Sequence, residues 1–151
     1  MRWARPAADV GLGLAAGLAG TLAMTLSSTV EMKLRGRSAS TAPADAAGKV
    51  LGVRPTDERG EARFSEAVHY GYGTGWGAVR GLLGTLGLPP VAAGAAHLAA
   101  VWGTEQVMLP ALKVAPPATR WGAKEVAVDA LHHLVYAAVT SAAYTVLDRH
   151  R

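Results

Sequence analysis

Residues 6–34 read PAADVGLGLAAGLAGTLAMTLSSTVEMKL, an apolar run that carries one acid near each end. A helix of about 20 apolar residues is long enough to cross the roughly 30 Å hydrocarbon core of a bilayer. Gly13, Gly17 and Gly20 recur at helical spacing, and such a small-residue face allows a neighbouring helix to approach closely. The same face continues to Glu31. The run therefore predicts a transmembrane helix that presents a carboxylate to its neighbours.

Three further apolar segments follow, separated by loops that contain proline and polar residues. These segments cover about residues 62–88, 91–112 and 121–147. Together with residues 6–34 they predict an all-α fold, namely a four-helix transmembrane bundle with up-down topology. We expect residues 1–151 to form a single integral-membrane domain surrounded by the lipid bilayer.

The first loop, residues 35–61, is long and polar but contains the signals of a short helix. The stretch from Thr41 to Asp45, with a proline inside it, is typical of a helix start, and Gly52 followed by Pro55 is typical of a stop. Apolar residues form a stripe between these two signals, which predicts a short interfacial helix lying over the bundle. A flexible linker is the alternative interpretation of this loop.

Composition excludes several classes of function. The chain has no cysteine, which rules out disulfides, iron–sulfur clusters and thiol chemistry. Its net charge is +4, but the basic residues cluster at segment ends and in loops without interleaved aromatics, so we expect no nucleic-acid partner. A bound metal would need histidine and carboxylate ligands, which suit iron, manganese or zinc.

Each apolar segment contributes one candidate carboxylate, and histidines accompany two of these four acids. In an up-down bundle these acids come to the same side of the membrane at similar depth. Ionisable groups inside a membrane are costly and are retained where they face partners, water or a metal. The candidate metal ligands are Glu31, Glu66, His69, Glu105, Asp129, His132 and His133.

The spacing of these residues is similar to that of carboxylate-bridged di-metal bundles. Such bundles use one Glu from each of two helices and a Glu-x-x-His motif from each of the other two. This chain has Glu31 and Glu105 singly, then Glu66-Ala-Val-His69 and Asp129-Ala-Leu-His132. The pattern favours a metal site with redox capacity, and a small lipophilic molecule is then a conceivable substrate. We expect only one of the two adjacent histidines, His132 or His133, to point inward.

Other interpretations of the same residues stay open. The acids and histidines could form a metal-free proton or ion pathway tied to pH homeostasis, or a purely structural network. A haem b held by two of His69, His97 and His133 is an alternative cofactor. The protein could also be a non-enzymatic membrane subunit or a homo-oligomer, with faces such as Gly73 and Gly77 serving helix contacts.

The second half of the chain resembles the YagU-like family of small bacterial inner-membrane proteins. The residues that carry the resemblance are Leu109-Pro110, Pro116-Pro117, Glu125, Asp129 and His133-Leu-Val-Tyr136, with Glu31 and His69 at polar positions in the first half. The resemblance implies a multi-pass protein of the bacterial inner membrane whose activity is largely unknown, with a suggested link to acid stress. It also favours His133 over His132 as the inward histidine. Glu105 stands where the family pattern has a histidine.

Overall fold

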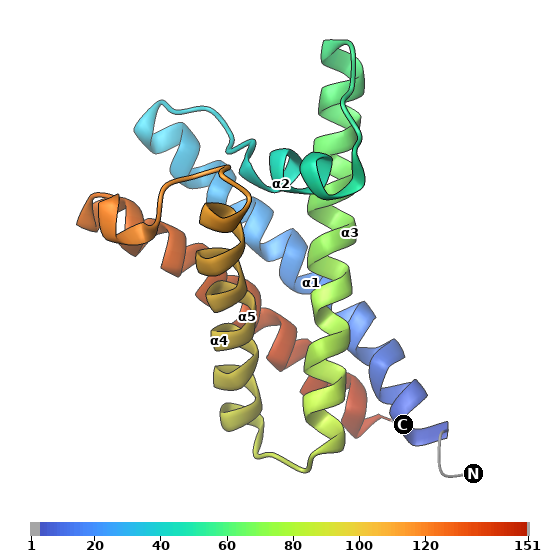
Figure 1. Ribbon diagram of the computed structural model, residues 1–151. Coiled ribbons are helices and arrows are strands. Elements are labelled where there is room, and N and C mark those ends of the chain that lie inside the picture. Colours follow the sequence, from blue (N-terminus) through green and yellow to red (C-terminus); the bar gives the residue numbers. More distant parts are fainter. Residues whose placement is uncertain (1–3, 151) are drawn as a thin grey trace.

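The computed structural model describes residues 4–150, and every regular element in that range is a helix (Figure 1). The all-α class expected from the sequence is thereby confirmed. The elements are α1 (Ala4–Arg35), α2 (Ala42–Leu51), α3 (Glu58–Thr85), α4 (Pro90–Ala111), the 3-10 helix η1 (Ala118–Arg120) and α5 (Ala123–Arg149). α3 starts earlier than expected because the Asp57 side chain accepts a hydrogen bond from the backbone N–H of Gly60 at 2.8 Å and caps the helix there.

The four long helices alternate in direction along the chain (Figure 1). α1 packs most extensively against α3 and α5, whereas α4 packs mainly against α5 and to a smaller extent against α3. The connections from α1 to α3 and from α4 to α5 lie on one side of the molecule, and the α3–α4 turn lies on the other side (Figure 1). The up-down order therefore brings the end of α1, the start of α3, the end of α4 and the start of α5 to a common side.

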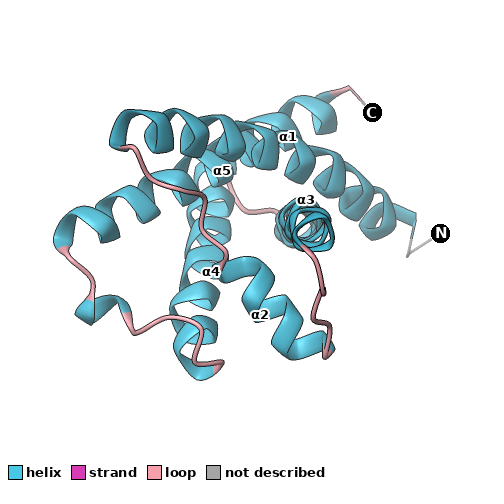
Figure 2. Cartoon of the chain, turned by 90° about the horizontal axis from the view of Figure 1, so that it is seen from above, coloured by secondary structure: helices cyan, strands magenta, loops and turns pink. Residues whose placement is uncertain are grey.

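The short helix predicted in the first loop is α2. It contains a proline in its first turn, and Gly52 ends it with a left-handed φ of 68°. α2 lies beside α3 and α4, on the side away from α1 and α5 (Figure 2). The Lys49 ammonium donates hydrogen bonds to the carbonyl oxygens of Leu112 at 2.8 Å and Lys113 at 3.0 Å. α2 therefore connects the first loop to the end of α4.

Glycines bring the backbones of α1 and α3 into direct contact. A Cβ placed on Gly17 would lie 2.7 Å from the Cα of Gly77 and 2.8 Å from the carbonyl oxygen of Thr74. A Cβ on Gly13 would collide with the carbonyl oxygen of Gly77 and lie 2.9 Å from the backbone N of Gly81. The small-residue faces expected on both helices thus pack against each other within one chain. A homo-oligomer would have to form through other surfaces.

Two of the described helices have the length and apolar composition to cross a membrane. They are α1 over Arg5–Arg35, with a mean hydropathy of 1.6 in its most apolar window, and α5 over Ala123–Arg149, with 1.2. α3 begins with a run of charged residues, and α4 carries a histidine, a glutamate and a glutamine, so neither reaches the same mean hydropathy. That all four long helices span the membrane stays a prediction.

A second polar cluster lies at the end of the bundle that holds the termini. Arg80 is only 2% exposed, so it does not extend its charge to the surface in this structure. Its guanidinium lies 4.4 Å above the ring of Tyr144, and its Nε donates to Ser141 at 3.1 Å. The Tyr144 hydroxyl donates to buried Asp9 at 3.2 Å. Arg80 and Asp9, from α3 and α1, therefore both contact the same tyrosine.

Candidate metal centre

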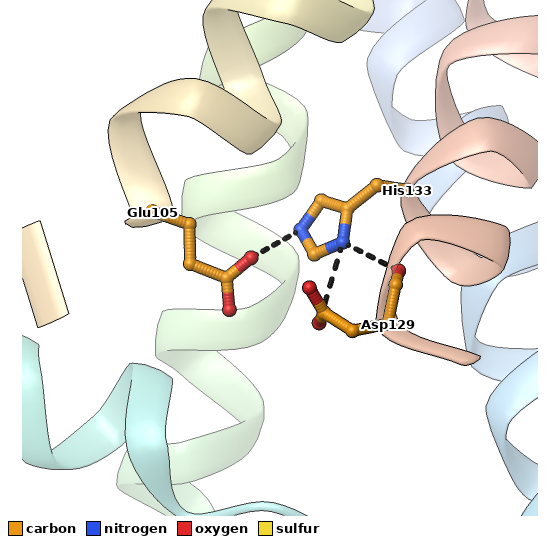
Figure 3. A group of neighbouring side chains, drawn as sticks. All are labelled: Glu105, Asp129 and His133. Carbon is orange, nitrogen blue, oxygen red and sulfur yellow. Dashed lines mark hydrogen bonds and ion pairs between the residues drawn. The ribbon is translucent and has the colours of Figure 1, made fainter. Parts of the chain in front are cut away.

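Three of the predicted site residues come together between α4 and α5 (Figure 3). Glu105 projects from α4, while Asp129 and His133 project from α5 one helical turn apart. One ligand atom from each of the three side chains can be chosen so that all three atoms lie within 4.8 Å of one another. His133 is 9% exposed, and the two carboxylates are partly buried. The site therefore combines one imidazole and two acids in a protected position.

Both nitrogens of the His133 ring face oxygen atoms (Figure 3). Nδ1 lies 2.9 Å from the backbone carbonyl oxygen of Asp129 and 3.6 Å from its carboxylate Oδ1. Nε2 lies 2.9 Å from Oε2 of Glu105. A carbonyl oxygen only accepts hydrogen bonds, so Nδ1 carries a proton. The other nitrogen, Nε2, is therefore the atom that binds either a further proton or a metal ion.

Two neighbours on α4 hold the Asp129 carboxylate. The indole N–H of Trp102 donates to Oδ2 of Asp129 at 2.8 Å, and the side-chain amide of Gln106 approaches the same oxygen at 3.4 Å. Groups of this kind orient a metal ligand and set its basicity. Neither Trp102 nor Gln106 was among the ligand candidates predicted from the sequence. Their positions beside Glu105, at i−3 and i+1, were the available signal.

Three side chains bearing oxygen and nitrogen ligands lie close enough that a small movement would let one divalent ion contact all three. Ligands at about 2.1 Å from an ion stand roughly 3 Å apart at right angles and up to about 4.2 Å apart when opposite. The 2.9 Å between Nε2 of His133 and Oε2 of Glu105 already matches the shorter of these separations.

No protein-family model, curated protein or solved structure matches this chain. Among the described residues, Glu105, Asp129 and His133 are the group with metal-ligating geometry.

Glu31 and His132 lie in a different cluster, between α1 and α5. Arg35 donates to Oε1 of Glu31 at 2.9 Å, and the Nε of Arg37 donates to the same oxygen, also at 2.9 Å. Nε2 of His132 lies 3.7 Å from Oε2 of Glu31, and Nδ1 of His132 lies 2.9 Å from the hydroxyl of Ser27. Two guanidinium groups thus already balance the charge of Glu31, which disfavours a cation at this carboxylate.

Both adjacent histidines are buried, so the expectation that only one points inward was wrong. His132 is 5% exposed and His133 is 9% exposed. The reason is that α5 has neighbours on two sides. α1 covers the face that carries His132, and α4 covers the face that carries His133. Two imidazoles about 100° apart around α5 are therefore each covered by a different helix.

The Glu66-Ala-Val-His69 motif on α3 does not reach the other acids in this structure. Glu66 is exposed. Nε2 of His69 lies 2.8 Å from the hydroxyl of Thr25, which donates its own proton to the carbonyl oxygen of Thr21 at 2.8 Å. His69 is therefore the donor to Thr25, and its Nε2 is not free for a metal.

His97 is fully buried and is not part of the group formed by Glu105, Asp129 and His133. Its Nε2 donates to the carbonyl oxygen of Trp76 at 3.0 Å, and its ring packs at 5.5 Å from that of Tyr136. Within the described part of the chain, its Nδ1 has no hydrogen-bond partner. The structure thus places His97 and His133 in separate surroundings on α4 and α5.

Replacing Trp102 with phenylalanine is expected to weaken metal binding without removing a ligand. The substitution keeps the aromatic packing but deletes the 2.8 Å hydrogen bond to Asp129. Loss of such a supporting bond typically lowers metal affinity by about 10- to 100-fold. Competition of the purified protein with a fluorescent chelator would measure the change. Trp121→Phe is a matched control because the indole of Trp121 donates to the carbonyl of Pro116, away from the site. Equal affinities of Trp102→Phe and wild type would contradict this role.

Proposed function

We propose that this chain is a multi-pass protein of the bacterial inner membrane that binds one divalent transition-metal ion through Glu105, Asp129 and His133. The main support for this proposal is that these three side chains lie close together. Nδ1 of His133 donates to the backbone carbonyl of Asp129 on the same helix, and Nε2 faces Glu105. Manganese, iron and zinc accept such mixed nitrogen and oxygen ligands. The inner-membrane assignment rests on the resemblance to the YagU-like family.

The surface of α1 supports the membrane part of the proposal. Six large apolar side chains recur at every fourth position and remain exposed: Leu14, Leu18, Leu22, Leu26, Val30 and Leu34. They form a stripe that winds along the last two-thirds of α1. Stripes of this size are rarely left in contact with water by soluble monomers, whereas acyl chains cover them at no cost. On α5, by contrast, His132, His133 and Thr140 are buried.

Charge balance supports a metal ion over a lone proton. With Nδ1 of His133 protonated, a neutral ring would point the Nε2 lone pair at Oε2 of Glu105 from 2.9 Å. Two lone pairs repel, so a proton or a metal cation must occupy this region. One proton would leave a net charge of −1 on the two acids and the imidazole, but a divalent ion would leave none. Neutrality is strongly favoured where polar groups are withdrawn from water.

The proposed ion would have coordination positions beyond its three protein ligands. An ion with open positions can activate a bound water or polarise a substrate oxygen, and iron or manganese can also exchange electrons. Because the site would lie within the membrane, a substrate that reaches it would be lipophilic. Elemental analysis and an absorption spectrum of detergent-purified protein test the proposal. About one metal per chain is expected, and its absence after reconstitution with iron, manganese and zinc would reject it.

A metal-free proton pathway is the second candidate, and the inward face of α5 favours it. His133, Tyr136, Thr140 and Tyr144 follow one another along this face and are all buried. Buried polar groups along a membrane-spanning helix are typical of proton relays. If this candidate is right, liposomes containing the protein leak protons and Asp129→Asn abolishes the leak. Tight vesicles would reject it.

A further inference from the structure

Gln106 is the only carboxamide side chain of this protein, since the chain has one glutamine and no asparagine. It follows Glu105 on α4 and lies beside the metal centre formed by Glu105, Asp129 and His133. Its Nε2 lies 3.4 Å from Oδ2 of Asp129, which is longer than the usual N–H···O hydrogen bond of about 2.7 to 3.2 Å. Its Oε1 is buried and has no hydrogen-bond partner among residues 4–150. The amide thus makes one weak contact and leaves its acceptor atom unused.

A cation at the metal centre would give this buried oxygen a partner. A buried acceptor without a partner loses the hydrogen bonds that it makes in water. Rotation by about 180° around the terminal bond of the side chain exchanges Oε1 and Nε2 within nearly the same volume. Without a cation, Oε1 turned toward Asp129 would face another acceptor, which favours the amino group in that position. A divalent ion bound to Asp129 reverses the preference, because the oxygen is the end of a side-chain amide that binds metal ions.

Trp102 allows the amide to turn without releasing Asp129. Its indole N–H donates to the same Oδ2 at 2.8 Å, which is an ordinary length for such a bond. The carboxylate therefore stays in place when the amide rotates. After the exchange, an oxygen would lie about where Nε2 is now, 3.4 Å from Oδ2 of Asp129. This separation falls between the roughly 3 and 4.2 Å expected for two ligands of one ion.

We propose that Gln106 is a fourth protein ligand of the metal centre and binds the ion through Oε1. This inference rests on the proposed function, because it concerns the same ion. The four side chains then offer one nitrogen and three oxygens, and carboxylate and carbonyl oxygens are ligands that suit Mn²⁺. An octahedral Mn²⁺ ion held in this way keeps open positions for water or a substrate oxygen.

A single ¹³C label measures the contact directly in the wild-type protein. Because Gln106 is the only glutamine, cell-free synthesis with glutamine labelled at its side-chain carbonyl carbon places one label at the site. Electron–nuclear double resonance on added Mn²⁺ then reports the distance from the ion to this carbon. We expect about 3 Å, from a metal–oxygen bond of about 2.1 Å and a C=O bond of about 1.2 Å. A carbon at about 5 Å, as for an amide that only donates to Asp129, would overturn the proposal and leave the three-residue site intact. A wild type that binds no Mn²⁺ would reject the metal centre together with its fourth ligand.

Affinity variants separate the oxygen of Gln106 from its N–H groups. Gln106→Met removes both and should weaken Mn²⁺ binding by at least about 10-fold, measured from the electron paramagnetic resonance signal of the free ion. Gln106→Glu keeps an oxygen without an N–H and should bind Mn²⁺ at least as tightly as the wild type does. Thr104→Met and Thr104→Glu make the same changes at an exposed neighbouring position and should bind as the wild type does. If Gln106→Glu binds as weakly as Gln106→Met, or Gln106→Met as tightly as the wild type, the oxygen is not a ligand.

Discussion

His133→Ala and Glu105→Ala are each expected to reduce the metal content of the purified protein from about one ion per chain to background. Each variant removes one of three ligands, and the two that remain cannot hold a divalent ion against water and buffer. The loss should exceed the roughly 10- to 100-fold change expected for a supporting residue such as Trp102. Inductively coupled plasma mass spectrometry on detergent-purified protein measures the ratio directly.

Two variants of matched chemistry act as controls for this experiment. His69→Ala removes a histidine that donates to Thr25, and Glu66→Ala removes an exposed acid. Both should retain the metal of the wild type. If His69→Ala and Glu66→Ala lose the ion together with the first pair, the larger ligand set expected from sequence is right and the three-residue site is wrong. If His133→Ala and Glu105→Ala both retain it, the ion lies elsewhere.

Gly17→Leu is expected to destabilise the protein by about 3 kcal/mol or more, at or above the upper end of usual overpacking effects. The first added carbon would lie 2.7 Å from the Cα of Gly77 and 2.8 Å from the carbonyl oxygen of Thr74. Both neighbours are backbone atoms, so no side-chain rotation can relieve the contact, and α1 and α3 must separate. Unfolding in mixed micelles of increasing dodecyl sulfate content, followed by circular dichroism, measures the change.

Gly11→Leu gives the baseline for that comparison. Gly11 lies on the same helix, and a Cβ there meets nothing within 4 Å. Its substitution should leave stability within about 0.5 kcal/mol of the wild type, as is usual for surface changes. A Gly17→Leu variant as stable as Gly11→Leu would mean that α1 and α3 are not in backbone contact.

The helices were predictable because their signals are local. Long apolar runs broken by proline and glycine predict helices without any knowledge of their neighbours, and α2 ends at the glycine where the sequence predicted a stop. Which helices cross the membrane was harder to predict from the sequence. The structure exposes leucines on one side of α1 and buries polar residues on one side of α5. Mean hydropathy averages over all sides of a helix, so it does not show which residues face outward.

The position of each candidate site residue along its helix was predictable from the sequence, but the neighbouring helix that its side chain faces was not. Counting residues along each helix placed Glu105 and Asp129 at similar heights, and they meet. The same count placed Glu31 and Glu66 at a similar height. In the structure, however, Arg35 and Arg37 donate hydrogen bonds to Glu31, and Glu66 is exposed. Which face of a helix meets which neighbour depends on all the packed side chains together. One sequence read by itself does not contain that information in a local pattern.

The glycine contact between α1 and α3 has a mechanical consequence for the whole bundle. Two helices in backbone contact cannot slide or turn past one another by a fraction of a residue, because each glycine fits between atoms of the opposite chain. They therefore move as one rigid body. α4 makes fewer contacts with its neighbours than α1 does, so relative displacement is concentrated at α4. Any such displacement changes the separation of Glu105 from His133 first, and the strength with which an ion is held would follow the position of one helix.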